Sequence, residues 1–181
     1  METIEGSIGM IEKRASLRHV AGLRFVARAG RGEDLKLEAA SGEPGYRPTE
    51  VLLIALAACA AMDVVSILAK KRQSWTGYAV EVRGLEREEH PQVFTWIELV
   101  HAFNGPDLED GAVRRAIELS ASRYCPVNAM LAAGPTEIHH RYLIGQEGGT
   151  AGSAMDEAAG ALEVVITGPD GRIDVTSWGT G

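Results

Sequence analysis

Two cysteines, Cys59 and Cys125, are the residues of this chain with the most distinctive chemistry. A thiolate is both a nucleophile and a metal ligand, so a pair of cysteines can do redox chemistry if the sulfurs meet. Cys125 directly precedes Pro126 at a predicted helix start, where free N–H groups and the positive end of the helix dipole favour an anion. Cys59 lies among apolar residues that disfavour a thiolate, so it needs a cation from elsewhere. The residue types leave two alternatives open, a redox pair or two small core hydrophobes.

The spacing of other possible ligands argues against a metal site. The cysteines show no CxxC spacing, and clustered ligands are absent from the sequence. His139 and His140 are adjacent on a predicted strand, so their side chains point to opposite faces. The remaining histidines are scattered. We therefore expect neither a metal nor a bound cofactor.

Cys59 belongs to a long apolar helix predicted over residues 48–72. Pro48 suits the first position of a helix. Residues 51–62 are apolar without a break, which predicts a helix buried on nearly all sides. Asp63 ends that run before the roughly 20 residues that a membrane span needs. One small sheet covers only one side of such a helix, so we expect it to pack against its copy in a homodimer.

The rest of the pattern predicts an α+β fold with an antiparallel sheet. Period-two alternation favours strands, and apolar residues at helical spacing favour helices. The predicted strands are 23–28, 35–39, 78–85, 93–103 and 137–144, and the predicted shorter helices are 108–123 and 127–132.

The predicted main domain covers residues 1–145. Residues 146–160 are rich in Gly, Ala and Ser and predict a flexible connector. The stretch 161–181 contains a strong turn signal, Gly168-Pro169-Asp170-Gly171, and predicts a small β-hairpin appendage. One function open to this tail is to add strands to the sheet of its own or a partner chain.

Composition limits the class of protein further. The chain has 181 residues, 45% hydrophobic and 24% charged, which is typical of a soluble globular domain. A formal net charge of −7 argues against a nucleic-acid partner. The amino terminus has no apolar core of signal-peptide length, so we expect a cytoplasmic protein with no membrane partner.

Two segments together resemble a known family. PTEVLLIALAACAAMDVVSIL, which contains Cys59, and LSASRYCPVNAML, which contains Cys125, are similar to segments of the OsmC/Ohr family of thiol-dependent hydroperoxide reductases. REEHPQVFTWIEL and DLEDGAVRRAIELSASRYC belong to the same resemblance, which spans roughly residues 20–144. Within the family the chain looks closest to the YhfA-like branch.

The resemblance implies an intertwined homodimer with the long helices packed centrally and two active sites at the interface. In the peroxidase branch, the cysteine matching Cys59 attacks the peroxide and becomes a sulfenic acid. The cysteine matching Cys125 then condenses with it to a disulfide, which an external dithiol reduces.

The peroxidase branch also activates its thiol with an arginine–glutamate pair. Arg24 is the candidate arginine, the alternative being a solvated charge on a strand. Thr49 occupies the position of the family's glutamate, and Glu50 follows it, either as a substitute or as an acidic residue stabilised by the helix dipole. Thr49, with Asp63 and Ser66 one and two turns beyond Cys59, is a candidate for the substrate site; Ser66 alternatively only packs the helix.

Two functions from different classes therefore compete. One is a thiol peroxidase that reduces organic hydroperoxides. The other is a non-catalytic scaffold of the same fold, whose cysteines line an apolar pocket for a hydrophobic ligand or sense redox state; the missing glutamate favours this second function.

Overall fold

The computed structural model describes residues 11–39, 42, 44–145, 162–167 and 173–174. The chain divides into two compact units, Met1–Val51 and Leu52–Gly181, each described by itself below. The boundary between these two units falls in the first turn of α1 (Pro48–Lys70). The domain boundary at residue 145 that the sequence suggests stays a prediction. The predicted connector, 146–160, lies outside the described residues.

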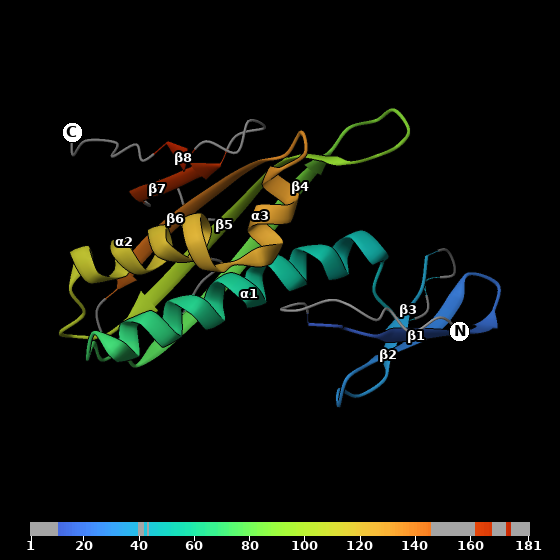
Figure 1. Ribbon diagram of the computed structural model, residues 1–181, viewed down its shortest axis with the longest axis horizontal. Helices are drawn as coiled ribbons and strands as arrows, with labels where there is room; N and C mark the ends of the chain where they lie inside the picture. Colours follow the sequence, from blue (N-terminus) through green and yellow to red (C-terminus); the bar gives the residue numbers. More distant parts are fainter. Residues whose placement is uncertain (1–10, 40–41, 43, 146–161, 168–172, 175–181) are drawn as a thin grey trace. The chain divides into compact units, whose positions relative to one another are not determined.

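The first unit contains a three-stranded antiparallel sheet in the order β1-β2-β3 (Figure 1). Its strands are β1 (Ala15–Ala21), β2 (Arg24–Ala29) and β3 (Leu35–Leu37). The predicted hairpin of β2 and β3 is confirmed by their pairing. β1 was not predicted from the sequence, because nearly all of its residues are exposed. A strand without a buried face does not show the alternation of apolar and polar residues on which the prediction depends.

The second unit is built on a five-stranded sheet in the order β4-β5-β6-β7-β8. The prediction of a wholly antiparallel sheet is wrong at one place, because β5 and β6 pair in parallel along their length. A parallel pair needs a long crossover connection, and the three helical segments between these strands supply it. The strands are β4 (Gly77–Glu86), β5 (Phe94–Asn104), β6 (Glu137–Gly145), β7 (Leu162–Thr167) and β8 (Ile173–Asp174).

The crossover consists of α2 (Asp110–Leu119), a π-helical turn η1 (Ser120–Tyr124) and α3 (Pro126–Ala132). Together with α1 these segments lie on one side of the sheet (Figure 1). The core lies between the two layers, where side chains of α1, α2, β5 and β6 form a common apolar cluster.

β7 and β8 pair antiparallel, as the turn signal between them predicted. β7 also pairs antiparallel with β6, so these strands extend the sheet of their own chain.

Helix α1 is completely buried along a single stripe only, formed by Leu56, Ala60, Val64 and Leu68 at intervals of four residues. Burial on nearly all sides, predicted from the sequence, is therefore not found in the single chain, where Met62 is 72% exposed. The reason is geometric, since one sheet can cover only one side of a helix. By length and composition alone α1 could also cross a membrane, a property that core helices of soluble proteins share.

α1 approaches the sheet closely at Gly84 of β4. A Cβ atom added at Gly84 would lie 2.7 Å from two ring carbons of Phe94 and 3.3 Å from a methyl carbon of Leu53. Because glycine has no side chain, both the Phe94 ring and Leu53 of α1 can pack closely against the backbone of β4 at this point.

A two-cysteine candidate active site

Three side chains from two parts of the second unit meet at the candidate site. Cys59 and Asp63 are four residues apart on α1, so they lie on the same face of the helix. Cys125 is the residue immediately before α3. The two sulfurs and a carboxylate oxygen of Asp63 all lie within 4.8 Å of one another, and both cysteines are free thiols.

The π-helical turn η1 positions two of the groups at this site. The N–H of Cys125 donates to the carbonyl of Ser120, five residues earlier, at 2.9 Å. In an α-helix residues five apart point about 140° away from each other. The wider π turn brings them closer to one face, so both Ser120 and Cys125 contact α1. Such turns are frequent at functional sites.

Asp63 is held by that same turn, because the Ser120 hydroxyl donates to its Oδ2 at 3.1 Å. Ser120 is itself fully buried. No ion pair to Asp63 is found within the part of the chain that the structure describes. The site therefore gathers two thiols and a carboxylate without a cation from the described part of its own unit.

Cys125 is 2% exposed, and its Sγ accepts a hydrogen bond of 3.3 Å from the N–H of Asn128. Burial, together with the neighbouring Cys59, raises the pKa of Cys125 to about 12, against a smaller opposite effect of the Asn128 N–H. The sequence-based expectation that the helix start favours a Cys125 thiolate is therefore wrong. The backbone N–H groups of Asn128 and Val127 both act to lower this pKa, but they do not compensate for the loss of water around a buried thiol.

A buried chain of hydrogen bonds leads from the site across the sheet. His140 Nε2 lies 3.2 Å from Asn128 Oδ1, and His140 Nδ1 lies 3.1 Å from His101 Nε2. His101 Nδ1 in turn lies 2.8 Å from the hydroxyl of Tyr78. The two histidine rings are stacked, at 5.4 Å between centroids, and both are 0% exposed.

The backbone carbonyl of Ala121 determines which atom donates in each hydrogen bond of this chain. Asn128 Nδ2 donates to the carbonyl of Ala121 at 3.1 Å, so its Oδ1 must accept from His140 Nε2–H. His140 Nδ1 then accepts from His101 Nε2–H, and His101 Nδ1 accepts from the Tyr78 hydroxyl. With both rings neutral, each histidine is therefore the Nε2–H tautomer, and the chain holds the Asn128 side chain in one orientation. The backbone N–H of the same residue donates to Cys125.

The neutral state of both rings agrees with their burial. Burial, and to a lesser extent the charge of His139, lowers the pKa of His140 to about 4. Burial followed by the charge of His140 lowers the pKa of His101 as well. Desolvation of an imidazolium is unfavourable, and the hydrogen-bonded chain from Tyr78 to Asn128 contains no carboxylate to offset it.

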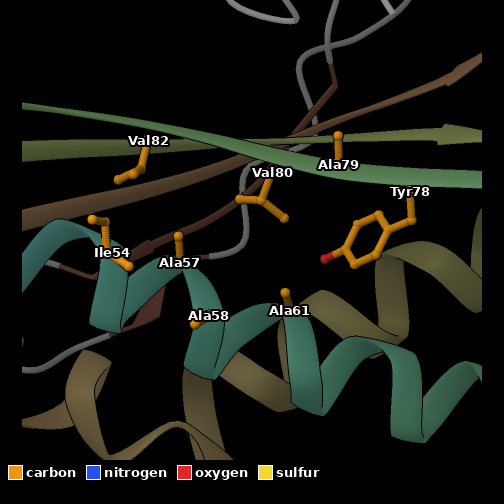
Figure 2. Close-up of a pocket in the computed structure, with 8 residues that line it drawn as sticks. All are labelled: Ile54, Ala57, Ala58, Ala61, Tyr78, Ala79, Val80 and Val82. Carbon is orange, nitrogen blue, oxygen red and sulfur yellow. The ribbon is translucent and has the colours of Figure 1, made fainter. Parts of the chain in front are cut away.

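An apolar hollow of about 350 Å³ lies between α1 and β4 (Figure 2). Figure 2 shows small residues of the helix facing side chains of the strand, with the Tyr78 ring at one end. Cys59 and Asp63 are not among the lining residues. Since a helix turns by about 100° per residue, they lie roughly on the opposite face of α1. The hollow is lined by Ile54, Ala57, Ala58, Ala61, Tyr78, Ala79, Val80 and Val82.

The remaining predicted site residues have other surroundings. Arg24 forms an ion pair of 3.7 Å with Glu38 inside the first unit. A carboxylate oxygen of Glu50 accepts a hydrogen bond of 2.8 Å from the N–H of Arg47, which places Glu50 at the start of α1. Thr49 and Ser66 are both exposed. The structure thus pairs the candidate arginine with Glu38, a residue that the sequence analysis did not consider.

The sequence analysis also missed the polar residues that support the site. Ser120 and Asn128 are polar residues on otherwise apolar helix faces. A polar residue at a predicted core position is a sequence feature that could have identified both of them. His140 was placed on the face opposite His139, which is correct, but its partner His101 comes from another strand. The ligand types that looked scattered along the chain are clustered in space at Cys59, Asp63 and Cys125.

The fold and the paired thiols define an α+β protein of the OsmC type. A family model described as OsmC-like protein matches residues 40–140, and this chain belongs to that family. YhfA of Escherichia coli K12 is 40% identical over 131 residues, which are 72% of this chain and 97% of YhfA.

Two solved structures extend the comparison. A hypothetical protein from Aquifex aeolicus is 29% identical, with a TM-score of 0.68 over 76% of this chain and 99% of that one. An organic hydroperoxide resistance protein OsmC from Legionella pneumophila is 12% identical, with a TM-score of 0.58 over 75% of this chain and 98% of that one. The second likeness shows the shared fold alone.

Proposed function

We propose that this protein is a thiol-dependent hydroperoxide reductase in which Cys59 is the peroxidatic cysteine and Cys125 the resolving cysteine. The observation that carries the proposal is the meeting of the two free thiols, within 4.8 Å, although they come from distant segments of the chain. Membership of the OsmC family supports the same chemistry.

Accessibility distinguishes the roles of the two thiols. Cys59 is half-buried, so a peroxide can reach it, whereas Cys125 is 2% exposed. The Cys59 sulfur attacks the terminal oxygen of the hydroperoxide and the O–O bond breaks. The products are a Cys59 sulfenic acid and an alcohol, which takes up the thiol proton. In this proposal the Asp63 carboxylate, which lies within 4.8 Å of the Cys59 sulfur, accepts a hydrogen bond from the peroxide O–H.

Resolution then requires only a short movement. The Cys125 thiol displaces the sulfenic hydroxyl, its proton leaves with that hydroxyl as water, and a disulfide forms. An S–S bond is about 2.0 Å long, so the sulfurs must approach by less than about 3 Å. An external dithiol, as expected in the cytoplasm that we propose for this protein, returns both thiols by two exchange steps.

The activating cation in this proposal is Arg24. Its partner is Glu38 rather than Glu50, since Glu38 is the carboxylate beside Arg24 and Glu50 accepts from the start of α1. A guanidinium can stabilise the Cys59 thiolate and bind a peroxide oxygen through its fixed fork of donors.

The proposal includes the homodimer. Ile54 and Met62 of α1 are 48% and 72% exposed in the single chain, and the apolar hollow that Ile54 helps to line opens to solvent. A second copy packed along α1 would bury these side chains. Met62→Asp is expected to convert a dimer into a monomer in sedimentation measurements, and a parent protein that is already monomeric at micromolar concentration would contradict the dimer.

The test of the function uses the reduced full chain and one equivalent of an organic hydroperoxide. We expect loss of both thiols and a Cys59–Cys125 disulfide in a non-reducing digest. Cys125→Ser should consume one equivalent and leave a sulfenic acid at Cys59 that dimedone traps, whereas Cys59→Ser should consume none. If both thiols stay free in the parent while the peroxide persists, the peroxidase is excluded.

The alternative, a non-catalytic scaffold, depends on cysteines that line an apolar pocket. The apolar hollow in Figure 2 lies on the other face of α1 from Cys59, which favours the peroxidase over this alternative. Retention of a hydrophobic ligand by the Cys59→Ser variant, with negligible peroxide turnover by the parent, would reverse that preference.

A further inference from the structure

We propose that Cys59, Asp63 and Cys125 form a binding site for a thiophilic divalent cation, with Zn²⁺ as the reference ion. The site would offer two sulfur ligands and one carboxylate oxygen. This inference does not depend on the peroxidase, because it uses the donor atoms and their geometry only.

The distances between the donor atoms suit a tetrahedral ion. With Zn–S bonds of about 2.3 Å and a Zn–O bond of about 2.1 Å, tetrahedral ligands lie roughly 3.5 to 3.8 Å apart. The three donor atoms already lie within 4.8 Å of one another. A contraction of about 1 Å, which side-chain rotation can provide, would complete the triangle. Cys59 and Asp63 share one helix face, so both can turn toward the same point.

Two of the three ligands, Asp63 and Cys125, already accept hydrogen bonds from neighbouring residues. The Ser120 hydroxyl donates to Asp63 Oδ2 at 3.1 Å, and the Asn128 N–H donates to Cys125 Sγ at 3.3 Å. Donors of this kind stabilise an anionic ligand and fix its orientation, as outer-shell partners do in metal sites. The side chain of Asn128 bonds to His140 and to the carbonyl of Ala121. The donors to two of the three ligands therefore belong to buried residues, Ser120 and Asn128.

The charge of the site also favours a cation. With both thiols ionised, the three ligands carry three negative charges, and no ion pair to Asp63 occurs in the described residues to balance them. Cys59 and Asp63 are only half-buried, so an ion can enter from their side. Three protein ligands leave a fourth position for water or another small molecule, the arrangement of exchangeable rather than structural zinc.

Metal binding and thiol oxidation would exclude each other. A sulfur bonded to Zn²⁺ is not free to attack a peroxide, and the disulfide removes both sulfur ligands. The oxidation state of the two cysteines would thus decide whether the ion is bound.

The test begins with the reduced, metal-free full chain, titrated anaerobically with Co²⁺ as a spectroscopic probe for Zn²⁺. We expect one Co²⁺ per chain, with sulfur-to-cobalt charge-transfer absorption and the strong visible bands of tetrahedral cobalt, both abolished by added Zn²⁺. Binding should release protons and tighten with rising pH, because the ligands bind deprotonated.

Variants assign the ligands. Cys59→Ser, Cys125→Ser and Asp63→Asn should each weaken Zn²⁺ binding by more than about 100-fold, and Ser120→Ala by about tenfold, the effect typical of an outer-shell partner. Asp107→Asn, an exposed acid near the start of α2, is the matched control and should change nothing. Circular dichroism on each variant separates loss of a ligand from loss of the fold.

The proposal is overturned if the parent binds Co²⁺ without charge-transfer bands, or if a folded Cys59→Ser or Asp63→Asn variant binds Zn²⁺ as tightly as the parent. Oxidation of the parent by one equivalent of peroxide is measured separately, with and without Zn²⁺. Thiols that resist peroxide without metal would exclude the peroxidase and leave the metal site intact, so the two failures are distinguishable.

Discussion

The buried His140 should make the stability of this protein strongly dependent on pH. Its ring is 0% exposed and is held neutral between His101 and Asn128. Because burial lowers the pKa of His140 to about 4 in the folded protein, the unfolded chain binds more protons between that pH and the ordinary value of 6.5. The stabilisation is therefore complete above pH 6.5 and is lost as the pH falls toward 4.

The size of the effect follows from the two pKa values. A difference of 2.5 pH units corresponds to about 3 kcal/mol in total, at about 1.4 kcal/mol per unit. Between pH 7.5 and pH 5, about 2 kcal/mol of this should be lost through His140 alone. His101 adds to the loss in the same direction, because its pKa is also lowered by burial.

The assay is urea unfolding, followed by circular dichroism at pH 7.5 and pH 5.0 and at one fixed protein concentration. His140→Gln removes the titrating ring, so this variant should be less stable at pH 7.5 but should lose about 2 kcal/mol less than the parent on acidification. His139→Gln, on the opposite face of β6, should keep most of the pH dependence, since burial is the larger cause of the His140 shift.

Nitrogen NMR of the histidine rings provides an independent measurement. It should show both His101 and His140 as Nε2–H tautomers at pH 7.5. A His140 ring that titrates near 6.5, or equal acid destabilisation of the parent and of His140→Gln, would refute the reasoning.

Three further predictions concern the packing around the site. Tyr78→Phe removes the hydroxyl that donates to His101 Nδ1 and should lower the free energy of unfolding by about 1 to 3 kcal/mol in urea at pH 7.5; an unchanged midpoint would show that this hydrogen bond does not stabilise the fold. Leu68→Ala, in the buried stripe of α1, should cost about 2 to 5 kcal/mol by the same measurement, with the exposed Met130→Ala as a near-neutral comparison. Gly84→Ala should cost about 1 to 3 kcal/mol, because its Cβ would lie 2.7 Å from the Phe94 ring, and a stability equal to that of the parent would mean that the ring moves freely.

Most elements of the fold could be predicted from local patterns. The unbroken apolar run before Asp63 predicted α1, and period-two alternation predicted β4, β5 and β6 to within a residue or two. β1 could not be predicted, because an exposed strand carries no alternation. The parallel pairing of β5 with β6 depends on where the crossover helices pack, and no local pattern records that choice.

The candidate site could be predicted only in part. Residue type and the family resemblance singled out Cys59 and Cys125. The sequence could not give the ionisation of Cys125, because a helix start and a buried environment act in opposite directions on a thiol and only the packing decides which is larger. Nor could it pair Arg24 with Glu38, since partners across a sheet depend on register and side-chain reach.

The sequence by itself thus determined most of the elements, through short-range periodicity, and the two sulfurs, through residue type, while the family followed from the resemblance of whole segments. The tertiary structure decided which distant side chains meet, namely Asp63 with the two thiols, Ser120 through the π turn, and the buried chain from Tyr78 to Asn128. Such meetings arise from the packing of segments far apart along the chain, where burial sets both the distances and the charges.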